Sequence, residues 1–279
     1  MSRPLLVIDG DSLAHRAYHA IPKTIRRGEE RRPANALVGF SNFLLRLREA
    51  EQPRAILVGW DSLDSPTYRH ELFSGYQGGR EFDAELLEQL DLLPKLVRAF
   101  GFAAAKAAGY EADDFLAAAV KHEEERGGTA VVATSDRDSF QLASPRTTIL
   151  QPVRGVSELT RVGPEEVRER YGVEPAQVPD FIALRGDPSD RLPGAKGVGP
   201  KTAADILRQY GSLEAALAEG RFAAQADELR IYKRMATLDA DAPLPPLEDQ
   251  TPAWADASAF ARALGMNALA DRLAGHAST

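Results

Sequence analysis

Three short apolar runs constrain the fold most, because each has the length of a buried strand and each is followed within three residues by an aspartate. The runs LLVI, AILV and AVVA precede Asp9, Asp61 and Asp136. Unbroken apolar strands that alternate with helices are typical of a parallel sheet covered on both faces. A fourth strand is expected at residues 147–153. We therefore predict an α/β fold in which the three aspartates lie at one edge of a parallel sheet.

The helical pattern divides the chain into two parts. Helices are expected at residues 35–50, 83–101, with Pro94 as a kink, and from about 112, the last ending before a Gly-Gly pair. From about residue 163 the chain becomes mainly helical. A proline-rich stretch at 239–252 is expected to be extended, and a final helical stretch runs from about 255 to 274. This pattern predicts a sheet-containing part, residues 1–162, and a helical part, residues 163–279.

Further carboxylates are expected to join the three strand-end aspartates. The helix that begins at GYEADD precedes the third strand, and the right-handed crossover places its start where the strands end. Ligands of open parallel sheets bind beyond the carboxyl ends of the strands. Two more acids come from the segment GDPSD, and another lies two residues after the third strand-end aspartate. The predicted set is Asp9, Asp61, Glu111, Asp113, Asp114, Asp136, Asp138, Asp187 and Asp190.

Nine carboxylates at one site would repel one another and raise one another's pKa, so the set predicts bound cations. The chain has no cysteine and only five histidines, and an oxygen-rich set suits Mg²⁺ or Mn²⁺ better than Zn²⁺. Two such ions about 4 Å apart are typical of phosphodiester cleavage. Although the net charge is −7, setting the nine acids aside leaves 34 basic and 32 acidic residues. The remaining surface is therefore compatible with a polyanion such as DNA.

A second motif, GVGPKTA, predicts a contact with phosphate. Gly197 and Gly199 allow a tight turn, and Pro200 suits the first position of a helix expected at 201–210. Backbone N–H groups at such a helix start bind phosphate. The stretch 191–210 carries four basic residues and one acid, which suits a DNA backbone. Contacts of this kind hold a duplex without reading its sequence.

The whole set of motifs resembles the bacterial 5′-nuclease (flap endonuclease) family, which includes the N-terminal domain of DNA polymerase I and phage 5′-exonucleases. The resemblance rests on VIDGDSLAHRAYHA, WDS with TYRHELFSGYQGGR, GYEADD, TSDRDSFQL, GDPSDRLPG and GVGPKTA, in family order. It implies a PIN-like α/β nuclease core. It also implies a helix–three-turn–helix element, of the helix-hairpin-helix kind, that binds duplex DNA around a potassium ion.

The resemblance also implies roles for individual residues. Asp9, Asp61, Glu111, Asp113 and Asp136 match ligands of a first catalytic metal; Asp136, Asp138, Asp187 and Asp190 match those of a second. Asp114 matches an adjacent acid outside direct ligation. Potassium is expected at Gly194, Ala195 and Val198. Residues of about 69–98 match the flexible arch through which a 5′ single strand passes. The expected DNA contacts are Arg69, Tyr76, Arg80, Arg191, Lys196, Gly197, Gly199, Lys201 and Thr202.

Three positions depart from the family pattern. Gln77 replaces the arch lysine that steers the scissile phosphate, and Arg69 or Arg80 could compensate. Arg191 stands where asparagine is usual and would add a phosphate contact. Asp11 stands where serine or asparagine is commoner.

The function predicted from the resemblance is a metal-dependent 5′-3′ exonuclease and flap endonuclease that acts in replication and repair. Two Mg²⁺ or Mn²⁺ ions would activate water for in-line attack on a phosphodiester. The expected substrates are 5′ flaps, nicked or gapped duplexes and RNA–DNA hybrids. A sliding clamp, a polymerase or a ligase are candidate partners. No apolar run near the N-terminus suits a signal peptide or membrane span, so a cytoplasmic, nucleoid-associated monomer is expected.

Two alternatives remain open at this stage. VIDGDS imitates the Asp-x-Asp loop of haloacid-dehalogenase-type phosphatases, but no lysine occurs from 122 to 195, and Asp61 and GYEADD stay unexplained. The other alternative is a DNA-junction-binding protein with weak catalysis, suggested by Gln77. Every expected metal carboxylate is present, which argues against that reading.

Overall fold

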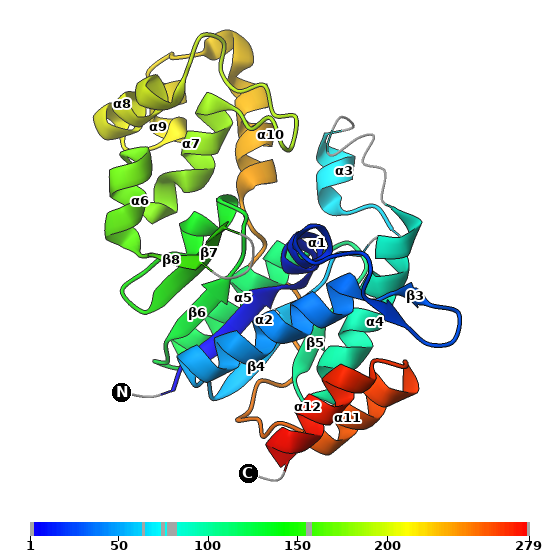
Figure 1. The fold of residues 1–279 in the computed structure, drawn as a ribbon. Coiled ribbons are helices and arrows are strands. Elements are labelled where there is room, and N and C mark those ends of the chain that lie inside the picture. Colours follow the sequence, from blue (N-terminus) through cyan, green and yellow to red (C-terminus); the bar gives the residue numbers. More distant parts are fainter. Residues whose placement is uncertain (1–2, 63–64, 74–75, 77–82, 155–157, 278–279) are drawn as a thin grey trace.

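A six-stranded sheet forms the centre of the computed structural model, which describes residues 3–62, 65–73, 76, 83–154 and 158–277. The strands follow the order β5-β4-β1-β6-β7-β8, and all neighbours are parallel except the antiparallel pair β7–β8 (Figure 1). A separate two-stranded hairpin joins β2 (Arg26–Arg27) and β3 (Arg32–Pro33). The sheet strands are β1 (Leu5–Asp9), β4 (Ala55–Gly59), β5 (Ala103–Ala105), β6 (Ala130–Ala133), β7 (Thr147–Arg154) and β8 (Glu158–Val162).

Helices cover both faces of the sheet, as the unbroken apolar strands predict. One group comprises α1 (Gly10–Ala20), α2 (Asn35–Glu51), α4 (Ala84–Ala99), α11 (Trp254–Ala263) and α12 (Asn267–Ala277). The other face and the carboxyl ends of the strands carry α5 (Ala112–Glu125), α6 (Pro164–Tyr171), α7 (Val178–Arg185), α8 (Pro200–Tyr210), α9 (Leu213–Ala218) and α10 (Ala226–Ala236) (Figure 1). Among the described residues no helix is both long and apolar enough to cross a membrane.

Side chains of β1 alternate between two apolar cores. Leu5 and Val7 pack in the core that contains α5 and α7, whereas Leu6 and Ile8 pack in the core that contains α1, α2 and α4. All four side chains are fully buried. The strand is therefore fixed from both sides, and its last residue, Asp9, is held at the edge of the sheet.

The predicted elements are confirmed in type, and the differences have local causes. Pro94 lies inside an uninterrupted α4. The three-alanine β5 contains no β-branched residue and β8 is mostly exposed, so neither strand was predicted. The final helical stretch is split into α11 and α12 at Gly265, whose φ is 73°.

The predicted arch, residues 69–98, is shorter in the structure than the sequence suggested. Helix α3 (Tyr68–Leu72) belongs to it, but α4 packs its leucines into the core from Leu86 onward. The part after residue 83 is therefore a core helix. Gln77 and Arg80 lie outside the described residues.

The segment after α10 returns to the sheet side of the molecule. Residues 239–253 contain no helix or strand, as predicted, and run to the start of α11. Gln250 N donates to Arg54 O at 2.8 Å, and Gln250 Oε1 accepts from Ile56 N at 2.8 Å. Helices α11 and α12 therefore join the same core as β1 and α2. The division at residue 163 remains a prediction.

Gly59 at the end of β4 provides a test of how the sheet positions α5. A Cβ at this position would lie 2.7 Å from Ala112 O and 3.3 Å from Phe115 Cβ. We expect Gly59→Ala to push the start of α5 off the strand and to lower the free energy of unfolding by about 1–3 kcal/mol. Urea unfolding measures this change.

Gly275→Ala in α12 is the matched control, because nothing lies within 4 Å of its added Cβ. An alanine inside a helix is favoured over glycine by roughly 0.5–1 kcal/mol. Equal losses of stability in both variants would contradict the proposed clash.

Candidate active site

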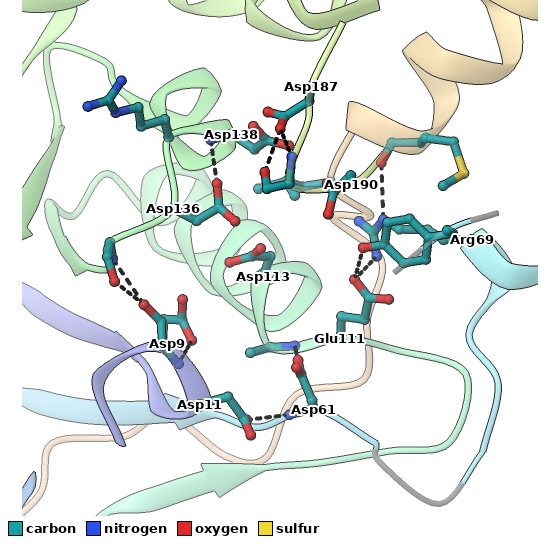
Figure 2. A pocket seen from close by; sticks show the side chains of 18 of the residues that line it. Asp9, Asp11, Asp61, Arg69, Glu111, Asp113, Asp136, Asp138, Asp187 and Asp190 are labelled. Carbon is teal, nitrogen blue, oxygen red and sulfur yellow. Dashed lines mark hydrogen bonds and ion pairs between the residues drawn. The ribbon is translucent and has the colours of Figure 1, made fainter. Parts of the chain in front are cut away.

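Eight of the nine predicted carboxylates line one cavity of about 690 Å³ at the carboxyl ends of the strands (Figure 2). They come from three strand ends, the first turn of α5 and the loop after α7. Asp114 is the exception, since it is fully buried behind the others. The eight are Asp9, Asp61, Glu111, Asp113, Asp136, Asp138, Asp187 and Asp190.

Asp9 ends β1 and caps α1. Its Oδ1 accepts from Ser12 N at 2.9 Å, and its Oδ2 accepts from Thr134 Oγ1 at 2.7 Å. Burial raises the pKa of the Asp9 carboxyl from 3.8 to about 7, against the two hydrogen bonds, and the charges of Asp61 and Asp136 add to the rise. The Asp9 carboxylate is thus fixed in orientation, and a nearby positive charge would stabilise its charged form.

Asp61 connects the end of β4 to the start of α5. Its Oδ1 accepts from Ala112 N at 2.8 Å, and its own N donates to Asp11 Oδ2 at 2.7 Å. Asp11 also lines the cavity and is buried, which raises its pKa well above the usual range. Asp11 was not among the predicted acids, although its position two residues after Asp9 is the signal that could have added it to the site.

The three acids at the start of α5 have three different surroundings. Asp114 accepts from Glu111 N at 3.0 Å and therefore caps the helix. Glu111 accepts from Thr67 Oγ1 and Tyr76 Oη, each at 2.8 Å. Asp113 points into the middle of the acidic ring in Figure 2, and its buried Oδ1 has no hydrogen-bond partner. Of the three acids, Asp113 therefore has the least compensated carboxylate in the cavity.

Arg69 neutralises the other two acids from inside the protein. Its Nη1 lies 3.1 Å from Glu111 Oε2 and 3.0 Å from Asp114 Oδ2, and its Nη2 lies 2.8 Å from Asp114 Oδ1. Its Nε donates to Met235 O on α10 at 3.1 Å. The side chain is only 2% exposed. Arg69 therefore joins α3, α5 and α10 around the acids, and its surface is not presented to DNA as the sequence led us to expect.

The second half of the cavity is built from the loop after β6 and the loop after α7. Asp136 Oδ1 accepts from Asp138 N at 3.0 Å, and Asp187 Oδ1 accepts from Ser189 N at 2.8 Å. Asp138 is buried with an unpartnered Oδ1, and burial, followed by the charge of Asp136, raises its pKa well above the usual range. A short backbone bridge between Asp187 and Leu192 turns this loop toward the cavity.

The donor set fits hard divalent cations. All the acids offer oxygen, two of their buried oxygens lack partners, and burial raises the pKa of Asp113 and Asp138, so their charged forms are disfavoured until positive charge is supplied. Within the described ranges, no three acidic or histidine side chains converge closely enough to form a ready-made metal cage. The unpaired oxygens of Asp113 and Asp138 can still serve a bound ion through water, because Mg²⁺ keeps several of its waters.

The predicted phosphate contact lies at the exposed start of α8. Gly197 has a φ of 77°, Gly199 is the N-cap, and nothing lies within 4 Å of a Cβ at either position. Lys201 and Thr202 are exposed in the first turn, and Arg191 and Lys196 are exposed in the preceding loop. Tyr76, by contrast, is 4% exposed and bound to Glu111, so this expected DNA contact is turned inward.

The three expected potassium positions lie in the same loop. Gly194 has a φ of 75°, and a Cβ there would lie 2.4 Å from Gly186 N, so only glycine fits. Ala195 N donates to Leu184 O at 2.8 Å, and Val198 N donates to Ala195 O at 3.0 Å. The loop is thus tightly packed on α7, while its role in ion binding stays a prediction.

Two family models cover most of the chain. The 5′-3′ exonuclease N-terminal resolvase-like domain matches residues 4–172, and the 5′-3′ exonuclease C-terminal SAM fold matches residues 173–257. The chain belongs to the 5′-3′ exonuclease family. The family resemblance seen in the sequence is therefore confirmed, and a haloacid-dehalogenase-type phosphatase loses its support.

Curated relatives of this exonuclease-family chain are much longer proteins. DNA polymerase I of Mycobacterium leprae (strain TN) is 44% identical over 211 residues, which are 75% of this chain and 23% of that protein. DNA polymerase I of Bacillus subtilis (strain 168) is 34% identical over 286 residues, 97% of this chain and 32% of that protein. The chain thus spans about a quarter to a third of these relatives.

Solved structures of low sequence identity share the fold. T5 5′-exonuclease with bound divalent zinc ions gives a TM-score of 0.72 at 18% identity and covers 97% of both chains. The catalytic core of Rad2 with a DNA substrate gives 0.59 at 15% identity, covering 98% of this chain and 92% of that one. These likenesses confirm the α/β core with a mostly parallel sheet and a helical C-terminal region.

The buried position of Arg69 predicts a large effect on stability. Arg69→Met leaves Glu111 and Asp114 buried without their counter-charge, so we expect a loss of about 3–5 kcal/mol in the free energy of unfolding, measured in urea without metal. A second change, Asp114→Asn, should recover part of that loss.

Arg234→Met is the control for this test. The Arg234 guanidinium lies 4.9 Å from the centre of the Tyr68 ring, close to the 4.6 Å of Arg69, but its side chain is 50% exposed. We expect a change within about 0.5 kcal/mol. A similar loss in both variants would show that packing on Tyr68, and not the buried charge, explains the effect.

Asp113 predicts a stability that falls as the pH rises. Burial, followed by the charges of Asp9 and Asp136, raises the pKa of Asp113 in the folded protein, so the folded state keeps this proton to a higher pH than the unfolded chain does. In EDTA, Asp113→Asn should therefore be more stable than the wild type by about 1–3 kcal/mol at pH 7.5, with the difference shrinking toward pH 4.

Urea unfolding at a series of pH values measures this difference. The exposed Asp256→Asn on α11 lies outside the cavity and should not reproduce the gain of Asp113→Asn. A gain for Asp113→Asn that was equal at pH 4 and pH 7.5 would contradict the role of its charge.

Proposed function

We propose that the protein is a structure-selective 5′ nuclease that hydrolyses DNA phosphodiesters as a 5′-3′ exonuclease and flap endonuclease. One observation carries the proposal: acids from three strand ends, one helix start and one loop line a single cavity in a chain of the 5′-3′ exonuclease family. The proposed substrates are 5′ flaps, nicked or gapped duplexes and RNA primer remnants. Their removal serves DNA replication and repair.

Mg²⁺ or Mn²⁺ is the proposed cofactor, with two or more ions. Asp9, Asp61, Glu111, Asp113 and Asp136 would hold one ion, and Asp136, Asp138, Asp187 and Asp190 would hold another, with Asp114 behind the first set. When bound, such ions supply the positive charge that activates a water molecule and stabilises the leaving oxygen. The T5 5′-exonuclease structure with bound divalent zinc ions supports a divalent cation as the cofactor class.

The protein's own groups orient the acids and hold the substrate. Ser12 N and Thr134 Oγ1 fix both oxygens of Asp9, while Arg69 and Tyr76 fix Glu111. These hydrogen bonds and ion pairs keep the carboxylates in place although they repel one another. The position of each acid is thus set before a phosphodiester enters the cavity.

DNA is proposed to bind along the exposed start of α8. Gly197, Gly199, Lys201 and Thr202 would contact phosphates through backbone N–H groups and side chains, and Arg191 and Lys196 would add charge. K⁺ would be held by backbone oxygens of Gly194, Ala195 and Val198. Arg80 remains a candidate contact from the arch. The Rad2 structures with DNA substrate support DNA as the partner class.

The cellular setting is proposed on the same basis. The polymerase relatives suggest work beside a polymerase, with a sliding clamp or a ligase as further partners, in a bacterial cytoplasm near the nucleoid. A monomer is the proposed state. Binding to DNA junctions with weak catalysis is the competing proposal, and the complete acid set argues against it.

Asp136→Asn tests the proposal, because Asp136 lies between both groups of acids. Labelled 5′-flap, nicked, blunt-duplex and RNA–DNA hybrid substrates are incubated with Mg²⁺ and with Mn²⁺. We expect cleavage of the flap substrate by the wild type and a loss on the order of 10²-fold or more in the variant. Binding of the flap substrate should remain, as measured by fluorescence anisotropy.

The exposed Asp256→Asn variant is the control and should cleave like the wild type. Unchanged cleavage by Asp136→Asn would refute the site assignment. Flap binding by the wild type without any Mn²⁺-dependent product would favour junction binding instead.

A further inference from the structure

Arg185, the last residue of α7, lines the acidic cavity but had no place in the predicted site. Its Nη2 lies 3.5 Å from Asp187 Oδ2, and its side chain is 21% exposed. Asp138 lines the same half of the cavity, and the charge of Arg185 acts on it. A permanent positive charge therefore lies in the half of the cavity where a second divalent ion is proposed.

Two aromatic rings hold this guanidinium in place. Its Cζ lies 5.6 Å from the centre of the Tyr171 ring and 5.3 Å from that of Phe181. The two rings stack on each other with centroids 4.9 Å apart and an angle of 20°. Cation–π contacts of this kind attract a cation without using its N–H groups. The arginine is thus positioned mainly by ring faces.

Arg185 differs in this respect from Arg69. Arg69 contacts two carboxylates and a backbone oxygen, all at 3.1 Å or less. Arg185 Nε, in contrast, is buried without a hydrogen-bond partner, and the Asp187 contact lies at the limit of hydrogen-bond length. Arg185 therefore contributes little to the orientation of a carboxylate. Its positive charge nevertheless acts on the carboxylates near it in the cavity.

We propose that Arg185 is a resident cation that weakens divalent-ion binding at Asp138, Asp187 and Asp190. A divalent ion in this half of the cavity must approach a guanidinium that the aromatic rings keep in place, and like charges at such distances repel strongly in a partly buried site. The half of the cavity that contains Glu111 has no uncompensated positive charge of this kind. There the guanidinium of Arg69 is paired with Glu111 and Asp114. The two halves therefore differ in affinity, and the weaker one fills when a phosphodiester adds negative charge.

This inference rests on the metal ligands proposed above, and Mn²⁺ binding without DNA tests it. Titration of the full chain with Mn²⁺ alone, followed by electron paramagnetic resonance of the free ion, should give a tighter and a weaker class of sites. Arg185→Met should tighten the weaker class by on the order of tenfold and leave the tighter class unchanged. Arg185→Lys, which keeps the charge, should stay within about twofold of the wild type.

Two further variants make the result specific. Arg170→Met is the matched control, since Arg170 also lies over an aromatic ring, Phe140 at 5.6 Å, but does not line the cavity. It should leave both classes unchanged. Asp187→Asn should remove the weaker class, and adding Arg185→Met to it should have no further effect. If Arg185→Met does not fold, as judged by its circular dichroism, Arg185→Gln is measured in its place.

The outcomes separate this inference from the proposed function. A wild type that binds no Mn²⁺ in the cavity would overturn the proposed metal sites themselves. Mn²⁺ binding that is unchanged in Arg185→Met would overturn only the role of Arg185. A lower Mn²⁺ affinity of the weaker class of sites in Arg185→Met would also overturn this role, because it would mean that Arg185 orders Asp187. A loss of flap binding by Arg185→Met in EDTA, with Mn²⁺ affinity unchanged, would assign the arginine to DNA instead.

Discussion

Repulsion between carboxylates gathered at the carboxyl ends of β1, β4 and β6 is the constraint on which the rest of the structure depends. The apolar cores on both faces of the sheet fix the strands, so the acids cannot move apart without disrupting buried packing. Hydrogen bonds from Thr134, Ser12 and Ala112 then hold individual oxygens. The scaffold thus stores an unfavourable arrangement that bound cations would relieve.

Two of the arginines that line the cavity compensate this negative charge in different ways. Arg69 is saturated by its acceptors and ties α3, α5 and α10 together around Glu111 and Asp114. Arg185 is held by ring faces and acts chiefly through its charge. One arginine therefore serves structure, while the other tunes the electrostatics of the cavity. Asp11, an additional acid beside Asp61, shifts the balance back toward negative charge.

The site could be predicted from the sequence wherever local pattern determines position. Parallel strands place Asp9, Asp61 and Asp136 at one edge, and the crossover adds the start of α5, so these acids followed from topology. Arg69 could not be placed, because its partners lie 42 and 45 positions away and only packing shows that it is buried. The same holds for Arg185, whose aromatic neighbours come from α6 and α7. Short strands such as β5 carry too little apolar pattern to be seen.

The path of the chain after α10 has a consequence for how the molecule holds together. Through Gln250 the chain returns to Arg54 and Ile56 at β4, and α11 and α12 complete the core begun by the first strand. The helical region that carries α8 is consequently an insertion between two contributions to one core. Its loss would expose the face of β1 that carries Leu5 and Val7, whereas removing the last helices would open the interior beside α2 and α4.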